Sequence, residues 1–361
     1  MAIAFAQATT ADEIEAVQRL RHRVYVEELG RYADVSEHGI FAEPEDATSW
    51  LFYAHDDGNV VACTRLTWGG DGFSKRQIDQ YRLEPFLADV PHEMIAVGER
   101  ASVLPDHRGT GLLDELMHFA REATSQYGIR VVFGCCEPHL LTLYLKMGCI
   151  TYADRNINSS SAGYLIPIIS FTPNSDALRG VTPGMAPDAL PKSVEHALSE
   201  HSAVRSQTLT MPDEYWSGIR RTLDELHDRR VGAFDGFTDD EARRCIERSN
   251  IIECAAGDRV LKRGGSAHNI FVVLRGTLEV RSGDQIVGVL SAGDTFGEMA
   301  FLLQNPRAFD VDAASDAEVL SLSEGALRKM ISDDAVVAAK LLLNVSKMLC
   351  WRLIRAESVD T

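Results

Sequence analysis

The stretch GDTFGEMAFLLQNPRAFDVDA, residues 293–313, decides how the C-terminal part of the chain folds. It places one acid, Glu298, and one base, Arg307, in apolar surroundings, where an unpaired charge is expensive. Gly297 and Glu298 open a predicted short helix whose free N–H groups favour an anion. Arg307 follows Pro306 and offers a planar fork that suits a phosphate. The stretch therefore predicts an anion site, although Glu298 and Arg307 could instead pair with each other.

Short predicted strands with glycine turns flank this stretch: GDRVL, NIFVVL, TLEVRS and QIVGVL. Their spacing predicts a small antiparallel β-roll or barrel. The last segment, 334–356, carries Val337, Leu341, Val345 and Met348 on one helical face. We expect this helix to cap a ligand or to form a homodimer with a second subunit.

Residues 233–356 resemble cyclic nucleotide-binding domains. The matching segments are Phe296-Gly297-Glu298-Met299-Ala300-Phe301, Pro306-Arg307-Ala308 and the turn glycines Gly257, Gly264 and Gly276. The resemblance implies that Gly297, Glu298, Met299, Ala300, Arg307 and Ala308 form a nucleotide site. In that site Arg307 and the Ala308 N–H would bind the cyclic phosphate, and Glu298 would bind the ribose.

Two residues depart from the family's cassette. Phe309 stands where the family has a small residue, so its ring could crowd the pocket. Asp310 would repel a phosphate if its carboxylate faced inward. Ala308 favours cAMP over cGMP as the effector in this resemblance.

Composition narrows the class of protein. The chain has 361 residues, 45% of them hydrophobic and 25% charged, which suits a globular protein of two or three domains. Its net charge of −17 argues against DNA and anionic membranes as partners. We expect no stable membrane insertion, because no apolar run could span a bilayer and no signal peptide opens the chain. Seven scattered cysteines without metal-ligand spacing predict reduced thiols, no metal and a cytoplasmic location.

A change in composition divides the chain. Residues 173–192 hold four prolines, and the polar stretch after them runs to about residue 231. We therefore expect domains at 1–172 and 233–361, joined by a linker and connecting helices at 173–232. The first domain reads as a helix at 11–29, a hairpin at Asp56-Asp57-Gly58, further strands near 93–104, 129–135 and 163–171, and helices at 112–127 and before Gly148.

The motif LPDHRGTGLLDELMHFA, residues 104–120, predicts a strand, a glycine loop and a helix. Gly109 and Gly111 let the backbone approach an anion closely, and Arg108 adds a charged donor. Such a loop suits a diphosphate or the phosphate of phosphopantetheine. By itself it could equally be a simple strand–helix turn.

With the order of elements around it, this loop resembles that of the GNAT acyltransferase superfamily, although Leu113 replaces a small residue of the motif. The resemblance implies that the acyl thioester binds at Arg108, Gly109, Thr110, Gly111 and Leu112. Downstream, LYLKMGC at 143–149 resembles the family segment whose tyrosine protonates the departing thiolate. Tyr144 is therefore the candidate acid, or else an ordinary core residue.

The segment LRHRVYVEELG at 20–30 resembles acyl-homoserine lactone synthases and long-chain N-acyl amino acid synthases. Those enzymes mostly take their acyl chains from acyl carrier protein, and the resemblance covers about residues 12–170. It implies a substrate network of Arg21, Tyr25, Asp46, Arg65 and Arg100, which could alternatively be ion pairs that stabilise the fold. Glu99 is the candidate base, although the family usually spaces its acid and arginine further apart.

These features predict an α+β GNAT-like mixed sheet with flanking helices, followed by an antiparallel β-roll of the cyclic nucleotide-binding type with a C-terminal helix. We expect a cyclic-nucleotide-regulated N-acyltransferase that moves an acyl group from acyl-CoA or acyl carrier protein to a small-molecule amine or a protein lysine. The alternatives are an acetyl-CoA-dependent acetyltransferase and a non-catalytic cyclic nucleotide sensor.

Overall fold

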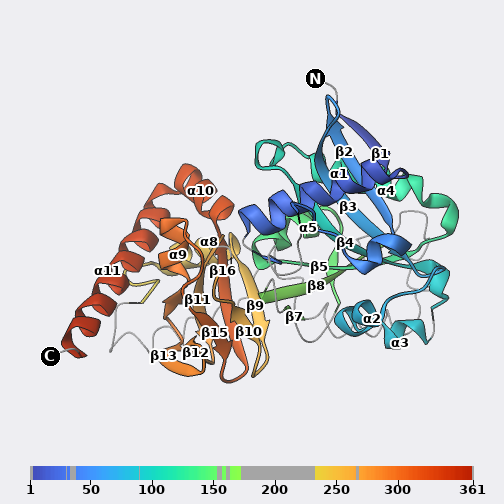
Figure 1. Ribbon diagram of the computed structural model, residues 1–361. Coiled ribbons are helices and arrows are strands. Elements are labelled where there is room, and N and C mark those ends of the chain that lie inside the picture. Colours follow the sequence, from blue (N-terminus) through green and yellow to red (C-terminus); the bar gives the residue numbers. More distant parts are fainter. Residues whose placement is uncertain are drawn as a thin grey trace. The chain divides into compact units, whose positions relative to one another are not determined.

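The computed structural model describes residues 3–29, 31–32, 38–88, 90–152, 157–159, 163–171, 232–265 and 268–359. The chain forms two compact units, one mainly from the N-terminal part of the sequence and one mainly from the C-terminal part (Figure 1). The predicted linker at 173–232 lies outside the described residues, apart from Gly232.

An eight-stranded mixed sheet forms the N-terminal unit, in the order β1-β2-β3-β4-β5-β8-β6 with β7 beside β8. Its strands are β1 (Ala4–Gln7), β2 (Trp50–Asp56), β3 (Asn59–Trp68), β4 (Ile95–Val103), β5 (Val131–Cys136), β6 (Ile150–Thr151), β7 (Ile157–Ser159) and β8 (Gly163–Phe171). Its α-helices are α1 (Ala11–Arg21), α2 (Lys75–Tyr81), α3 (Glu84–Leu87), α4 (Leu112–Ala123) and α5 (Leu141–Lys146). The sheet and its flanking helices confirm the predicted fold class.

Alternation along the strands gives the sheet two apolar faces. One face packs against α1, and its buried core consists of Ala8, Val17, Leu20, Leu51, Tyr53 and Cys63. The other packs against α4, and its core consists of Phe52, Ala54, Val61, Ala62, Leu66, Ala96, Leu112, Leu116, Ala120 and Ile129. Neighbouring residues of β2 thus point to opposite helices.

The helix predicted at 11–29 differs from expectation in its second half. A capping box between Thr10 and Glu13 starts α1, but the α-helix ends at Arg21. His22–Glu28 then forms a wider π-type turn, a rare form that is frequent at functional sites.

The predicted hairpin turn is confirmed, since Asp57 and Gly58 have φ of 46° and 83° and Asp56 pairs with Asn59.

Strands β4 and β5 pair over only part of their length. Ile95–Val97 lies parallel to Val131–Phe133, and no further pair joins these two fully described strands. Just beyond, β4 contains one extra residue relative to β3, and Arg100 has a left-handed φ of 58°. A bulge of this kind leaves one residue out of the ladder and bends the strand. The two strands therefore separate beside a backbone irregularity.

The C-terminal unit consists of two four-stranded antiparallel sheets, β10-β15-β12-β13 and β14-β11-β16-β9. Its strands are β9 (Asn250–Cys254), β10 (Arg259–Leu261), β11 (Asn269–Arg275), β12 (Thr277–Ser282), β13 (Gln285–Ser291), β14 (Thr295–Phe296), β15 (Asp310–Ala313) and β16 (Ala317–Ser323). Its helices are α8 (Asp239–Glu247), α9 (Glu298–Leu303), α10 (Glu324–Asp333) and α11 (Ala335–Val359). The predicted antiparallel β-roll and C-terminal helix are confirmed.

Helix α11 covers the core of its own unit. The predicted apolar face of this helix, formed by Val337, Leu341, Val345 and Met348, is buried within the unit. Val337 and Leu341 pack with α8, α10 and β11 residues in one core cluster. The unit's own core therefore occupies this face, so a homodimer through α11 would need another face of the helix.

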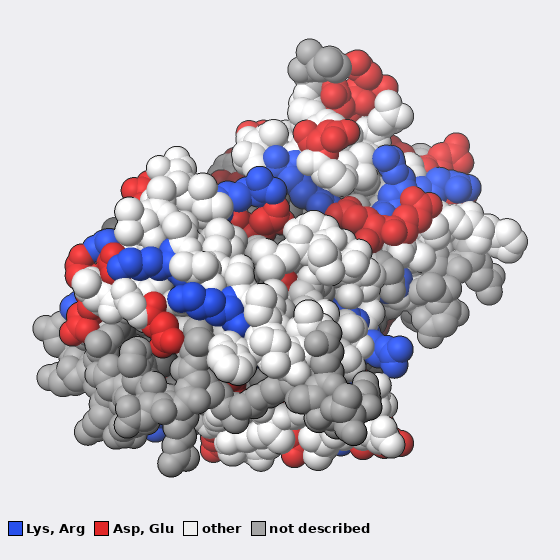
Figure 2. All heavy atoms as spheres, turned by 90° about the vertical axis from the view of Figure 1, so that its left-hand side faces the viewer, with Lys and Arg blue, Asp and Glu red and all other residues white. Residues whose placement is uncertain are grey.

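Figure 2 views the molecule from the side on which α11 lies in Figure 1. Lys and Arg lie there in small groups near Asp and Glu, with broad uncharged areas between them. None of the described helices is both long and apolar enough to cross a membrane.

Candidate functional site

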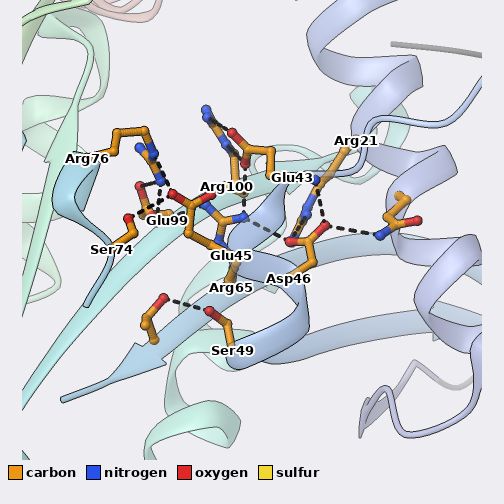
Figure 3. A network of polar contacts seen from close by, with 12 residues as sticks. Arg21, Glu43, Glu45, Asp46, Ser49, Arg65, Ser74, Arg76, Glu99 and Arg100 are labelled. Atoms are coloured by element: carbon orange, nitrogen blue, oxygen red, sulfur yellow. Dashed lines mark hydrogen bonds and ion pairs between the residues drawn. The ribbon is translucent and has the colours of Figure 1, made fainter. Parts of the chain in front are cut away.

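A cluster of buried charges lies between α1, β3 and β4 of the N-terminal unit (Figure 3). Arg21 and Arg65 are fully buried, and each donates to the Asp46 carboxylate, at 2.7 and 2.9 Å. The cations are Arg21, Arg65, Arg76 and Arg100, and the anions are Glu43, Glu45, Asp46 and Glu99. Four charges of each sign make the cluster neutral, although Nε and Nη2 of Arg21 and Nε of Arg65 have no hydrogen-bond partner in the described structure.

Glu99 is the most heavily bonded carboxylate of this cluster. It accepts hydrogen bonds from Arg65 at 2.9 Å, Arg76 at 2.9 Å, Gln77 at 2.8 Å and Tyr81 at 3.1 Å. Burial alone would raise the pKa of its carboxyl, but the neighbouring arginines outweigh burial and lower that pKa to about 2. A carboxylate with so low a pKa accepts a proton poorly, so this geometry disfavours the predicted role of Glu99 as a base.

Arg100 is held at the bulge from several sides. Its guanidinium binds Glu43 through two nitrogens and lies 4.8 Å from the ring centre of Tyr32 and 5.4 Å from that of Phe41. The Tyr25 hydroxyl donates to the Ala101 carbonyl at 3.2 Å. The predicted network residues Arg21, Tyr25, Asp46, Arg65 and Arg100 thus lie around one bulge.

Sequence reasoning missed several members of the cluster. These are Glu43, Glu45, Arg76, Gln77 and Tyr81. One signal was present: Ser74 and Gln77 form a capping box that starts α2. Nothing in the sequence pattern, however, indicates that α2 lies against β4.

The glycine loop between β4 and α4 has the predicted backbone. Gly109 and Gly111 have φ of 76° and 89°, and Gly111 is the N-cap of α4. The Thr110 hydroxyl donates to the His107 carbonyl at 2.7 Å, and the Leu112 side chain belongs to the core. The loop therefore offers backbone N–H groups to a ligand rather than the side chains of Thr110 and Leu112.

Arg108 of this loop already has an anionic partner. Its two terminal nitrogens donate to the two Glu28 oxygens at 2.6 and 2.7 Å, and its Nε donates to the Val103 carbonyl at 2.9 Å. Arg108, the residue predicted to bind the phosphate, thus forms a bidentate ion pair with Glu28 at the end of the π-type turn.

Tyr144 lies on α5 and is partly buried. Burial raises the pKa of its phenol well above 10, with smaller effects in the same direction from Cys136 and Tyr25. The hydroxyl is therefore protonated at neutral pH, and its raised pKa makes it a weaker acid than a free phenol.

In the C-terminal unit, Arg307 is a buried cation that makes hydrogen bonds only to neutral groups. It is 5% exposed, and its Nη1 and Nη2 donate to the backbone carbonyls of Gly297 and Asn269. Burial lowers the pKa of the guanidinium to about 10, although Glu298 acts in the opposite direction. Within the described ranges, no carboxylate forms an ion pair with Arg307, and its Nε has no hydrogen-bond partner. Such a group is suited to an incoming anion.

Glu298 has a different partner. Its carboxylate pairs with Arg352 of α11, which also donates to the Thr295 carbonyl. The alternative in which Glu298 and Arg307 hold each other is therefore wrong. Instead, α11 supplies the partner of Glu298, the residue predicted to bind the ribose. One oxygen of Glu298 has no hydrogen-bond partner in the described structure.

The backbone at Gly297 requires glycine. Its φ is 78°, and a Cβ there would lie 2.7 Å from Nη1 of Arg307.

Phe309 and Asp310, the two residues that depart from the family cassette, are not placed as the sequence suggested. The Asp310 carboxylate accepts a hydrogen bond from the Arg263 backbone N–H at 2.8 Å. Phe309 is 40% exposed. Of the other predicted ligands, Ala300 is buried, whereas Met299 and Ala308 are exposed.

Comparison with known proteins gives a separate result for each unit. Residues 16–164 match the family model described as N-acyl amino acid synthase FeeM. Residues 251–334 match the model of the cyclic nucleotide-binding domain. The acyl-homoserine lactone synthase LasI has a TM-score of 0.39 and 13% identity, covering 47% of this chain and 89% of that one.

Several curated relatives are cAMP-dependent protein kinase regulatory subunits. The cAMP-dependent protein kinase regulatory subunit of Mycosarcoma maydis is 31% identical over 121 residues, covering 31% of this chain and 23% of that protein. Glutaminase 2 of Bradyrhizobium diazoefficiens is 25% identical over 245 residues, covering 59% of this chain and 39% of that protein. This chain spans about a quarter of the length of the kinase subunits that it matches. The protein thus joins an acyltransferase domain like that of the N-acyl amino acid synthases to a C-terminal cyclic nucleotide-binding domain.

Proposed function

We propose that the protein is a cyclic-nucleotide-regulated N-acyltransferase that uses an acyl thioester, carried by acyl carrier protein or coenzyme A. The observation that carries this proposal is the separation of β4 and β5 beside the bulge at Arg100. A bulge leaves a peptide N–H without a ladder partner, and such a donor can stabilise the oxyanion of a thioester carbonyl under attack. The glycine loop that follows β4 would receive the donor's phosphate.

In the reaction, the acceptor nitrogen forms a bond to the acyl carbon while the carbon–sulfur bond breaks. We assign the proton that neutralises the thiolate to the Tyr144 hydroxyl, which carries its proton at neutral pH. The tyrosinate that remains takes a proton back from solvent. The proton released by the amine leaves to solvent and balances the one that Tyr144 donates. Replacing Tyr144 by Phe should therefore lower kcat far more than it changes the donor KM.

Glu99 has a positioning role in this proposal. Its carboxylate orders Arg65, Arg76 and Gln77 around β4, and its pKa of about 2 leaves it unsuited to take the ammonium proton. We propose that the acceptor enters as the free amine. The value of kcat/KM should then rise with pH until the pH reaches the pKa of the acceptor's own amine. A pH-independent kcat/KM between pH 5.5 and 7 would instead favour an enzyme base.

The effector site couples to the rest of its unit through Glu298. A cyclic phosphate would give Arg307 the anion that it lacks, and a ribose hydroxyl would compete with Arg352 for Glu298. Because Arg352 belongs to α11, ligand binding would bias the position of that helix. The kinase subunits among the relatives are named for cAMP, which together with Ala308 supports cAMP as the effector.

The acceptor is proposed from the family match. The name N-acyl amino acid synthase supports a small amine such as an amino acid, with a protein lysine as the alternative acceptor. Acyl carrier protein is then the proposed donor partner. All seven cysteines are free thiols, which supports a cytoplasmic location.

The test is an acylation assay with the full chain. Acetyl-CoA, long-chain acyl-CoA and long-chain acyl carrier protein are each offered with a mixture of amino acids, with and without cAMP, and products are identified by mass spectrometry. We expect acylated amine from a long-chain donor and a rate that changes with cAMP. A preference for acetyl-CoA would favour an acetyltransferase, and no acylation from any donor would favour a non-catalytic sensor.

A further inference from the structure

The π-type turn His22–Glu28 is anchored at three points. At its start, Arg21 donates to Asp46 at 2.7 Å within the buried charge cluster. In its middle, the Tyr25 hydroxyl donates to the Ala101 carbonyl at the β4 bulge. At its end, Glu28 forms the bidentate pair with Arg108 of the glycine loop. One short segment thus joins the charge cluster, the bulge and the loop.

The pair between Glu28 and Arg108 uses the arginine fork completely. Both terminal nitrogens contact Glu28, and Nε donates to Val103. Two carboxylate oxygens present nearly the same acceptor geometry to a guanidinium as two phosphate oxygens do. The side chains are 42% and 29% exposed, so water and a ligand can reach the pair. A phosphate can bind the face of Arg108 that Glu28 occupies only after Glu28 moves away.

We propose that Glu28 competes with the phosphate of the donor for Arg108 and so sets the affinity and selectivity for phosphopantetheine thioesters. This inference rests on the proposed acyl-transfer function. When a donor phosphate binds, Arg108 exchanges its charge-assisted pair with Glu28 for one with the phosphate, so its guanidinium is not left unpaired. A ligand without phosphate cannot make that exchange and gains nothing from Arg108.

The exchange has a consequence at the bulge. Once Glu28 leaves Arg108, the end of the π-type turn loses its contact with the glycine loop, while Tyr25 still holds the Ala101 carbonyl. The Ala101 peptide lies next to Arg100, whose left-handed φ marks the bulge. Glu28 is therefore a positioning residue, which should affect the donor KM more than kcat.

The experiment measures binding of coenzyme A and of pantetheine, which lacks the phosphate, to the full chain by calorimetry. Glu28→Gln keeps the shape of the side chain and removes its charge. Glu15→Gln is the matched control, because Glu15 pairs with Arg19 at 2.6 Å on the preceding helix α1, away from the loop. Half-exposed ion pairs contribute up to about 1 kcal/mol, which corresponds to about fivefold in Kd.

We expect Glu28→Gln to bind coenzyme A about fivefold more tightly, with pantetheine binding unchanged and Glu15→Gln equal to the wild type. The donor KM should fall by a similar factor, with kcat within twofold. Equal or weaker coenzyme A binding by Glu28→Gln overturns the proposal, as does the lack of binding to every variant.

Failure of the proposed function gives a different pattern. If Glu28→Gln tightens coenzyme A binding but no thioester acylates an amine, the competition stands and the acyl-transfer function is wrong. If the wild type and Glu28→Gln both turn over with the same donor KM, the acyl-transfer function stands and the competition is wrong.

Discussion

Arg307 gives the sharpest prediction, because its charge is buried and no carboxylate among the described residues pairs with it. Burial lowers the pKa of the guanidinium from 12.5 to about 10, a difference of about 2.5 units. At 1.36 kcal/mol per unit, the buried charge costs the folded state about 3 kcal/mol. The folded pKa of this base lies below its unfolded value, so the cost is present throughout the range below pH 10.

Replacing Arg307 by Gln removes this cost together with two hydrogen bonds to carbonyls, each worth about 1–2 kcal/mol. The two effects nearly cancel, so we expect the stability without nucleotide to stay within about 1 kcal/mol of the wild type. The stabilisation by cAMP should disappear. For the wild type that stabilisation is about 2.7 kcal/mol at a concentration one hundred times the Kd.

The assay is calorimetric unfolding of the full chain with and without cAMP. Arg259→Gln is the matched control: Arg259 pairs with Asp312 in the same unit, so its loss should leave the cAMP effect intact. A loss of 3–5 kcal/mol without nucleotide is the cost of breaking a structural buried ion pair. That loss, combined with a retained cAMP effect, would refute the reasoning.

Three further predictions follow from the same structure. The carboxyl of Glu99 has a pKa of about 2 in the folded protein, against an ordinary value of 4.5. Its charge therefore contributes about 3 kcal/mol to the free energy of unfolding above pH 4.5, and this contribution is lost as the pH falls toward 2. The stability of Glu99→Gln should fall less steeply with acid than that of the wild type, and an equal slope would contradict the low pKa. Gly297→Ala should abolish cAMP binding in calorimetry, because its Cβ would lie 2.7 Å from Arg307, whereas Gly283→Ala, with open space around its Cβ, should bind normally. Finally, we propose a homodimer through the outward face of α11, where Val336, Leu343 and Cys350 are exposed and seven residues apart. Mild oxidation should link two chains through Cys350, Leu343→Glu should prevent the link, and Ile286→Glu on β13 should not; a monomer in light scattering would contradict the dimer.

Much of the fold could be predicted because its signals are local. The turn at Asp57-Gly58 needs residues that tolerate positive φ, and the helix α9 follows a glycine with φ of 78°. The apolar periodicity of α11 likewise identified the helix. It could not identify the partner of that face, because a helix reads the same whether its apolar side meets its own unit or another chain.

The candidate sites divide in the same way. The sequence by itself determined which residues are candidates for the chemistry: a glycine loop with Arg108, a cassette with Glu298 and Arg307, and charged residues near Arg21 and Glu99. Local spacing suffices for these, since loops and caps are defined by neighbours in the chain.

Only the tertiary structure decided the partners of these charges. Arg352 lies 54 positions from Glu298 and Glu28 lies 80 from Arg108, yet each forms the ion pair that sets the state of its site. Glu99 changed from a candidate base to a saturated carboxylate because α2 brings Gln77 and Tyr81 against it. The protonation and availability of a charged group depend on what packs around it, and packing between distant segments leaves no periodic signal in a single sequence.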